Sequence, residues 1–170
     1  MNEYAVTVIG HDRPGIIADV AEILAALGLN LTDSTMTRLR GHFAMTLVCA
    51  GTVAAAEIES ALAPLTADRT LLVTVREVGE ELVEAPSGEH YVLTVHGADR
   101  LGIVAALSRT VAAAGGNITD LTTRLAGNLY VVVAEVDASG AMADLAAAID
   151  QTAAELGVEA TLRAGEADLM

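Results

Sequence analysis

The chain has 170 residues, of which 53% are hydrophobic and 2% aromatic, and its net charge at neutral pH is -14. Such an acidic chain repels nucleic acid phosphates and anionic membrane surfaces, so we expect no direct binding to nucleic acid or membrane. With so few aromatic residues, the core must be built from Val, Leu, Ile and Ala.

The first half of the chain alternates between patterns typical of strands and of helices. An apolar helical stripe begins at Ile16 and ends before Gly28, which is a typical residue after a helix C-terminus. The stripe contains Ile16, Ile17, Val20, Ile23, Leu24 and Leu27. A second helix contains Ile58, Leu62 and Leu65 on its apolar face. The strands are expected over residues 4–9, 31–38, 42–49 and 71–75, with the middle two forming a hairpin.

A charged and turn-prone stretch, residues 79–88, predicts a linker, after which the same order of elements returns. Strands are expected over residues 91–96, 118–124, 129–136 and 158–162, and helices over 103–114 and 142–156. The sequence therefore predicts two domains, residues 1–78 and 89–164, followed by a loose tail over 165–170.

The order strand, helix, strand, strand, helix, strand with short connections predicts a ferredoxin-like βαββαβ fold of the α+β class. Each domain should have one antiparallel sheet with both helices on one face. The other face has no helix of its own to cover it, so an apolar lining there requires a neighbour. We therefore expect a homo-oligomer or a pairing of the two repeats, with the order of assembly left open.

One loop occurs twice, as GHDRPGI at residues 10–16 and as GADRLGI at residues 97–103. It joins a strand to a helix, where the first helical amides lack partners and can bind a small anion. We expect Gly10 and Gly97 to adopt positive φ, and Asp12 and Asp99 to cap the helices. Gly15 and Gly102 would let a ligand approach the backbone. A purely structural turn is the alternative, since such a loop is a weak signal by itself.

The stretches VTVIGHDRPGIIADVAEILAALGLNLTDS and LTVHGADRLGIVAALSRTVAAAGGNITDL resemble the opening of ACT domains, which are small regulatory modules that bind amino acids. The resemblance covers residues 3–163 as two tandem copies. It is strongest in the shared loop and in the later GLNLTD and GNITD segments. A chain made of two such domains resembles the glycine cleavage system transcriptional repressor group.

In this family the ligand lies between paired domains, in contact with the first loop of one and the start of the second strand of the other. A first helix of about 14 residues separates Asp12 from Asn30 by about 20 Å, so one small ligand cannot touch both within one repeat. We expect one site from residues 12–16 with Asn117 and Ile118, and another from residues 99–103 with Asn30 and Leu31. Pairing between chains would instead combine like repeats. The candidate ligand-binding residues are His11, Asp12, Arg13, Gly15, Ile16, Asn30, Leu31, Asp99, Arg100, Gly102, Ile103, Asn117 and Ile118.

Each group in these sites has an expected role. Backbone amides around the second glycine of the loop would hold the ligand carboxylate, while Asn30 and Asn117 would bind its ammonium or carboxylate group. Ordinary turn chemistry is the alternative for the asparagines. Arg13 and Arg100 could pair with the carboxylate or simply balance surface charge. Arg38 and Arg124 are expected to be equivalent residues at the hairpin ends.

The repeats differ at several loop positions, which predicts unequal affinities of the two sites. His11 corresponds to Ala98, and Pro14 corresponds to Leu101. The four histidines, His11, His42, His90 and His96, have no close spacing typical of metal ligands, so no metal site is expected. Only His11 is retained as a candidate ligand contact.

The sequence contains few motifs that would indicate catalysis or a particular cellular compartment. Cys49 lies in an apolar strand pattern, where a buried, inert thiol is expected. No phosphate-binding loop with lysine, nucleophile elbow or Cys–His pair is found, so we expect neither an enzyme nor a cofactor. The N-terminus lacks a signal peptide pattern and no apolar stretch is long enough to span a membrane, which predicts a cytoplasmic protein.

The resemblance implies a regulatory sensor that binds a small amino acid such as glycine or serine. Such a sensor would control a protein partner, for example a transcription factor of amino acid metabolism. The alternative is a non-catalytic interaction subunit of a metabolic enzyme whose ligand sites are vestigial.

Overall fold

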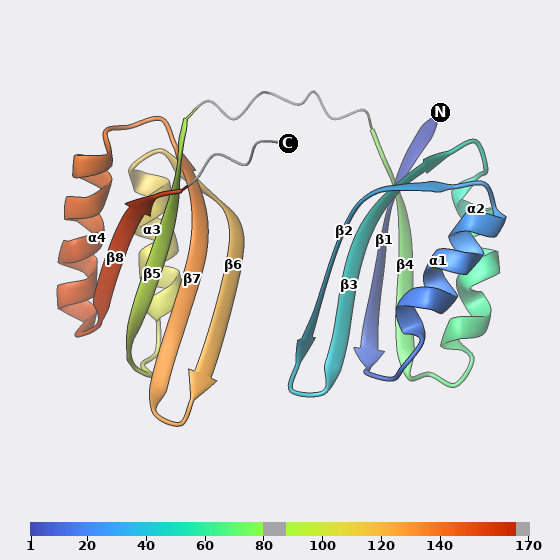
Figure 1. The fold of residues 1–170 in the computed structure, drawn as a ribbon, viewed down its shortest axis with the longest axis horizontal. Coiled ribbons are helices and arrows are strands. Elements are labelled where there is room, and N and C mark those ends of the chain that lie inside the picture. The colour runs from blue at the N-terminus through green and yellow to red at the C-terminus, as the bar shows by residue number, and fades with distance from the viewer. Residues whose placement is uncertain (80–87, 166–170) are drawn as a thin grey trace. The chain divides into compact units, whose positions relative to one another are not determined.

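The computed structural model describes residues 1–79 and 88–165, which form two compact units that divide after residue 82 (Figure 1). The predicted linker over 79–88 and the predicted tail over 165–170 lie almost entirely outside the described residues. Every helix within the described residues is too short or too polar to cross a bilayer.

Both units have the predicted βαββαβ order. Unit 1 contains β1 (Asn2–His11), α1 (Ile16–Ala26), β2 (Asn30–Leu39), β3 (His42–Gly51), α2 (Ala55–Leu62), the 3-10 helix η1 (Ala63–Thr66) and β4 (Leu71–Val78). Unit 2 contains β5 (Glu89–Ala98), α3 (Ile103–Ala113), β6 (Gly116–Ala126), β7 (Leu129–Ala138), α4 (Met142–Leu156) and β8 (Glu159–Ala164). The strand orders are β2-β3-β1-β4 and β6-β7-β5-β8, with all pairs antiparallel. The predicted ferredoxin-like class is therefore confirmed.

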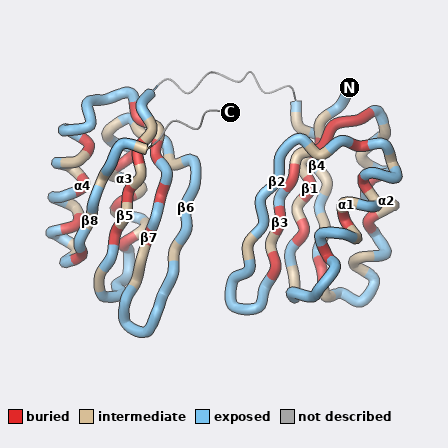
Figure 2. Tube along the Cα trace, viewed as in Figure 1, coloured by how far each residue is buried: buried red, intermediate tan, exposed pale blue. Residues whose placement is uncertain are grey.

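Alternation along the central strands places the core between the sheet and the helices. Tyr4, Val6 and Val8 on β1 are fully buried, and the equivalent Tyr91, Leu93 and Val95 on β5 are at most 1% exposed. Buried residues concentrate on the central strands, whereas the edge strands β2 and β6 are largely exposed (Figure 2). Most buried side chains are aliphatic, as the composition predicts, but the three largest of them are the aromatic residues Tyr4, Phe43 and Tyr91.

One helix face differs from the prediction. α1 buries Ile16, Val20 and Leu24, which lie four residues apart on one stripe. Ile17 was expected on the same face but is 45% exposed. Successive residues are rotated by about 100° around a helix axis, so Ile17 lies beside the stripe that faces the sheet.

Both helices of a unit lie on the same face of its sheet, and no helix of that unit covers the other face (Figure 1). This helix-free face carries a row of four cross-strand neighbours in unit 1, one per strand: Thr35, Thr46, Thr7 and Thr74. The same row in unit 2 is Thr122, Val133, Thr94 and Thr161. Apolar residues lie beside the threonines, and Ile9 and its cross-strand neighbour Leu72 are 45% and 61% exposed. A neighbour over this face stays a prediction.

Candidate functional site

The repeated loop of unit 1 lies at the end of the sheet where β1 stops and the β2–β3 turn begins. His11 and His42 are paired across β1 and β3, which brings the turn beside the loop. The backbone N–H of Asp12 donates to the Gly41 carbonyl oxygen at 3.1 Å. The Arg38 Nη1 atom lies 3.2 Å from Asp12 Oδ2. These contacts fix the start of the loop against the hairpin.

Gly15 is the N-cap of α1, with φ of 90° in the left-handed region, and no side chain caps the helix. The N–H of Asp19 donates to the Gly15 carbonyl oxygen at 2.9 Å. The amides of residues 16–18 precede this bond and have no acceptor inside the helix. The expectation that Asp12 and Asp99 are the caps is wrong, because the glycines at Gly15 and Gly102 occupy that position. The free amides give this helix end a partial positive charge.

The expectation of positive φ at the first glycine holds for Gly10, at 159°, but not for Gly97. Both residues lie inside strands, and crowding explains glycine there. A methyl group on Gly10 would overlap the Thr70 carbonyl oxygen, and one on Gly97 would lie 2.8 Å from Val158 Cγ1. The first glycine therefore allows the neighbouring segment to pack closely, while the second forms the helix cap.

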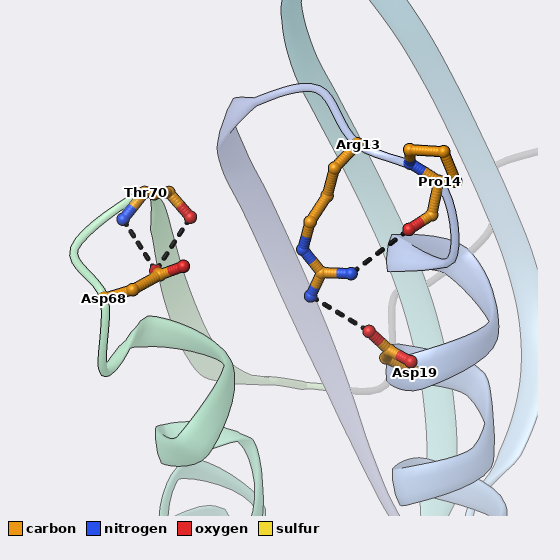
Figure 3. A network of polar contacts seen from close by, with 5 residues as sticks. All are labelled: Arg13, Pro14, Asp19, Asp68 and Thr70. Carbon is orange, nitrogen blue, oxygen red and sulfur yellow. Dashed lines mark hydrogen bonds and ion pairs between the residues drawn. The ribbon is translucent and has the colours of Figure 1, made fainter.

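Arg13 turns back over its own helix (Figure 3). Its Nη2 atom lies 2.9 Å from Asp19 Oδ2, and its Nη1 donates to the Pro14 carbonyl oxygen at 3.2 Å. Nearby, the Thr70 N–H and hydroxyl donate to Asp68 Oδ1 at 2.9 and 2.7 Å. These two bonds hold the pKa of the Asp68 carboxyl below its usual range, the backbone bond most strongly. The charges around the loop are thus largely balanced within unit 1.

A pocket of about 540 Å³ opens between the loop, the first turns of α1 and the edge of the sheet. It is lined by Asp12, Arg13, Pro14, Gly15, Ile16, Ile17, Ala18, Ala21, Met36 and Phe43. Four predicted ligand-binding residues are therefore brought together here. His11 lies outside, because its position alternates with the buried residues of β1 and faces the helix-free side. Met36 comes from the outer strand β2, so the pocket borders the free edge of the sheet.

Asn30 and Leu31 lie at the opposite end of the same sheet. Asn30 pairs with Ala50, which pairs with Glu3, eight residues along β1 from His11. Eight residues of strand span about 26 Å, so these residues cannot share one small ligand with the loop of unit 1. Leu31 and its counterpart Ile118 also pack against the cores of their own units. The combination of each loop with residues of another unit stays a prediction.

Comparison with known proteins identifies the modules. The sequence profile of the ACT domain matches residues 4–76 and 89–163, nearly all of both units. The chain belongs to the ACT domain family. Among curated relatives, UPF0237 proteins of Methanopyrus kandleri and Methanocaldococcus jannaschii are 46% identical over 48 residues and 37% identical over 71 residues. These matches cover 28% and 40% of this chain, and 53% and 79% of the relatives. The chain spans about half the length of the first curated relatives that it matches.

Two solved structures match both ACT domains in tandem. An unknown protein from Galdieria sulphuraria has a TM-score of 0.80 and 27% identity, over 96% of this chain and 98% of that chain. A candidate glycine cleavage system transcriptional repressor has a TM-score of 0.73 and 18% identity, over 95% and 96% of the two chains. At 18% identity, the second similarity supports the fold alone.

The second ACT domain keeps the loop backbone but changes its side chains. Gly102 has φ of 90°, and the N–H of Ala106 donates to its carbonyl oxygen at 2.9 Å. Ala106 stands 87 residues after Asp19, so Arg100 lacks the acidic partner of Arg13. A methyl group on Gly157 would lie 3.0 Å from Arg100 Nη1, which places this guanidinium over the C-cap of α4. The negative end of that helix favours a cation there.

The predicted equivalence of Arg38 and Arg124 is wrong. Arg38 pairs with Phe43 in the first domain. Tyr130 is the counterpart of Phe43 in the second domain, and it pairs with Leu125. Arg124 pairs instead with Val131, one position earlier. A shift of one residue turns a strand side chain to the opposite sheet face. The second domain therefore has no arginine in the position from which Arg38 reaches Asp12.

The histidines all occupy helix-free sheet faces. His90 Nδ1 lies 2.9 Å from Asp137 Oδ1, and His96 Nε2 lies 3.1 Å from Glu159 Oε2. His11 and His42 instead face each other, with ring centroids 5.4 Å apart. Sequence spacing missed His42, because only the register of β1 with β3 brings it to His11. In the part of the chain that the structure describes, no three His, Cys, Asp or Glu side chains gather as a metal site.

Proposed function

We propose that this chain is a non-catalytic regulatory protein whose ACT domains bind an amino acid at the loop end and thereby control a partner protein. The pocket of about 540 Å³ at the α1 N-terminus carries the proposal. It combines free helical amides, one acidic side chain and an apolar wall in a family whose domains are regulatory. That combination suits a zwitterion with a short side chain.

The head groups of an amino acid have matching partners in the pocket. The amides of residues 16–18 would hold the carboxylate at the positive end of α1. The Asp12 carboxylate, whose side chain is 29% exposed, would accept hydrogen bonds from the ammonium group. Arg13 and Arg38 already contact carboxylates of the domain, so we assign them to positioning of the loop.

A second ACT domain would complete the site at the free edge of β2. If its own edge strand were added antiparallel to β2, its asparagine end would lie beside the loop end of the first domain. In this arrangement residues 12–16 would form one site with Asn117 and Ile118, and residues 99–103 would form another with Asn30 and Leu31. Like repeats of two chains would combine in the same way.

We propose glycine or serine as the ligand and a transcription factor of amino acid metabolism as the partner. The fold shared with a candidate glycine cleavage system repressor supports this choice. An effector coupling of about 1–3 kcal/mol would be sufficient, since it changes partner affinity about 5- to 150-fold. The high negative charge favours action through a protein rather than through direct DNA contact.

One observation favours a second candidate function, an interaction subunit with vestigial sites. The two charged side chains in the pocket lining, Asp12 and Arg13, already have ion-pair partners within the domain. A vestigial loop could retain such pairs without any ligand.

Thermal unfolding in the presence of each of the twenty amino acids separates the two functions. A ligand at 100 times its dissociation constant adds about 2.7 kcal/mol of stability, which raises the melting temperature by several degrees. The shift should be selective for glycine or serine, should be reduced in Asn30→Ala or Asn117→Ala, each of which removes one site, and should be lost when both are combined. Asn128→Ala, in the β6–β7 turn, is the matched control and should keep it. If no amino acid shifts the melting temperature, the sensor proposal is wrong.

A further inference from the structure

His11 and His42 lie beside each other on the helix-free face of unit 1. His11 ends β1 and His42 begins β3, and the two residues are direct cross-strand partners. Both are exposed, so neither ring is committed to the core. The hydrogen bond from the Asp12 N–H to the Gly41 carbonyl oxygen fastens the segments that carry them. The backbone thus presents two imidazoles side by side in a fixed register.

The separation of the rings suits a shared metal ion. At the usual zinc–nitrogen distance of about 2.0–2.1 Å, a metal lies about 3.2 Å from the centroid of each ligating imidazole. A tetrahedral angle between the two ligands then places the centroids about 5.2 Å apart. The observed distance between the His11 and His42 centroids is 5.4 Å. The pair therefore has the centroid separation that a shared tetrahedral ion requires.

The chemistry of the pair selects the kind of cation. Imidazole nitrogen is a ligand for Zn²⁺, Cu²⁺ and Ni²⁺, while Mg²⁺ and Ca²⁺ prefer oxygen. The net charge of -14 raises the local concentration of cations around the chain. Because no third His, Cys, Asp or Glu joins the pair among the described residues, water would fill the remaining positions.

We propose that His11 and His42 form a two-imidazole site for a divalent transition metal ion, with Zn²⁺ and Cu²⁺ as its probes. The site is specific to the first domain, since the corresponding pair of cross-strand neighbours in the second domain is Ala98 and Leu129. It is independent of the amino acid pocket, because the histidines lie on the opposite sheet face from α1.

Zinc titration calorimetry of the untagged full chain tests the site. We expect one equivalent of Zn²⁺, with affinity reduced on the order of 100-fold in either His11→Ala or His42→Ala, because the second imidazole binds at a high effective concentration. The double variant keeps neither imidazole and should bind at least as weakly as either single variant. His90→Ala and His96→Ala are controls and should bind normally. Equal losses in all four single variants, or none in the first two, would overturn the proposal.

A transplant and a spectroscopic readout make the test independent of any loss of folding. Ala98→His with Leu129→His places the same pair on β5 and β7, where both positions are exposed. This double variant should bind a second equivalent of metal with similar affinity. Electron paramagnetic resonance of the Cu²⁺ complex of the natural chain should show two nitrogen ligands, and one nitrogen would contradict a shared site.

Discussion

Alanine substitutions of four glycines should separate the two reasons for glycine in the repeated loop. Gly15 and Gly102 have the same left-handed φ of 90°, with no atom closer than 3.8 Å to an added methyl group on Gly15 and none within 4 Å on Gly102. Their cost is therefore the left-handed backbone alone, about 1–2 kcal/mol for each alanine variant. The two variants should destabilise their own domains equally.

Gly10→Ala and Gly97→Ala should cost more, because their methyl groups meet neighbouring atoms. At Gly10 the group would overlap the Thr70 carbonyl oxygen and lie 2.9 Å from Leu71 Cα, both of them backbone. Overpacking costs about 1–3 kcal/mol, and losing the bond from His11 N–H to Thr70 adds about 1 kcal/mol. We therefore expect about 2–4 kcal/mol for Gly10→Ala, and less for Gly97→Ala, where the nearest atom is a valine methyl.

Amide hydrogen exchange measured residue by residue gives the stability of each domain separately, which global unfolding of a two-domain chain does not. The expected order of destabilisation is Gly10, then Gly97, then the two cap glycines together. If Gly15→Ala costs as much as Gly10→Ala, the assignment of crowding to one position and backbone conformation to the other is wrong. A large difference between Gly15→Ala and Gly102→Ala would equally contradict it.

Three further outcomes can be checked. Arg13→Ala should destabilise the first domain by less than about 1 kcal/mol, because Arg13 and its partner Asp19 are 42% and 40% exposed; amide hydrogen exchange at low and high salt should show a smaller loss at high salt. In an NMR titration, Thr70→Val should raise the low pKa of Asp68 only part of the way to its usual value, because the hydrogen bond from the Thr70 N–H remains. In the natural chain, the stability that this carboxylate contributes is lost as pH falls through the lowered pKa. Burial raises the pKa of the Cys49 thiol, so thiol reagents should label it only after unfolding, and this group should lower native stability as alkaline pH passes its usual pKa.

Local sequence patterns are sufficient to predict the fold, because each helix and strand has its own hydrophobic periodicity. The alternation of Tyr4, Val6 and Val8 and the spacing of Ile16, Val20 and Leu24 each identify one buried face. Strand ends were less predictable: β1 was expected over residues 4–9 but runs from Asn2 to His11. Its additional residues pair with β3 without contributing to the core, so no hydrophobic signal marks them.

The candidate site was only partly predictable, because it depends on register rather than on spacing. Contiguous residues of the loop line the pocket because they are neighbours in the chain. Met36 and Phe43 join them from β2 and β3, and no spacing in the chain indicates that they do. The mistaken equivalence of Arg38 and Arg124 has the same origin. Both arginines lie near a hairpin end, but the pairing of the strands, which sets the face, is a long-range property.

The two ACT domains share the backbone of the loop and its Asp-Arg pair, but the second domain lacks the charged partners Asp19 and Arg38, and this difference predicts unequal ligand sites. A carboxylate held by the first amides of the helix requires only the glycine cap, which both domains have. The ammonium partner differs: Asp12 shares its carboxylate with Arg38, whereas Asp99 has no arginine in the corresponding position. An aspartate without a competing guanidinium offers more negative charge to a ligand cation. If the proposed amino acid sites exist, the loop of the second domain should therefore bind the ammonium group more tightly, and the first domain should respond at higher ligand concentration.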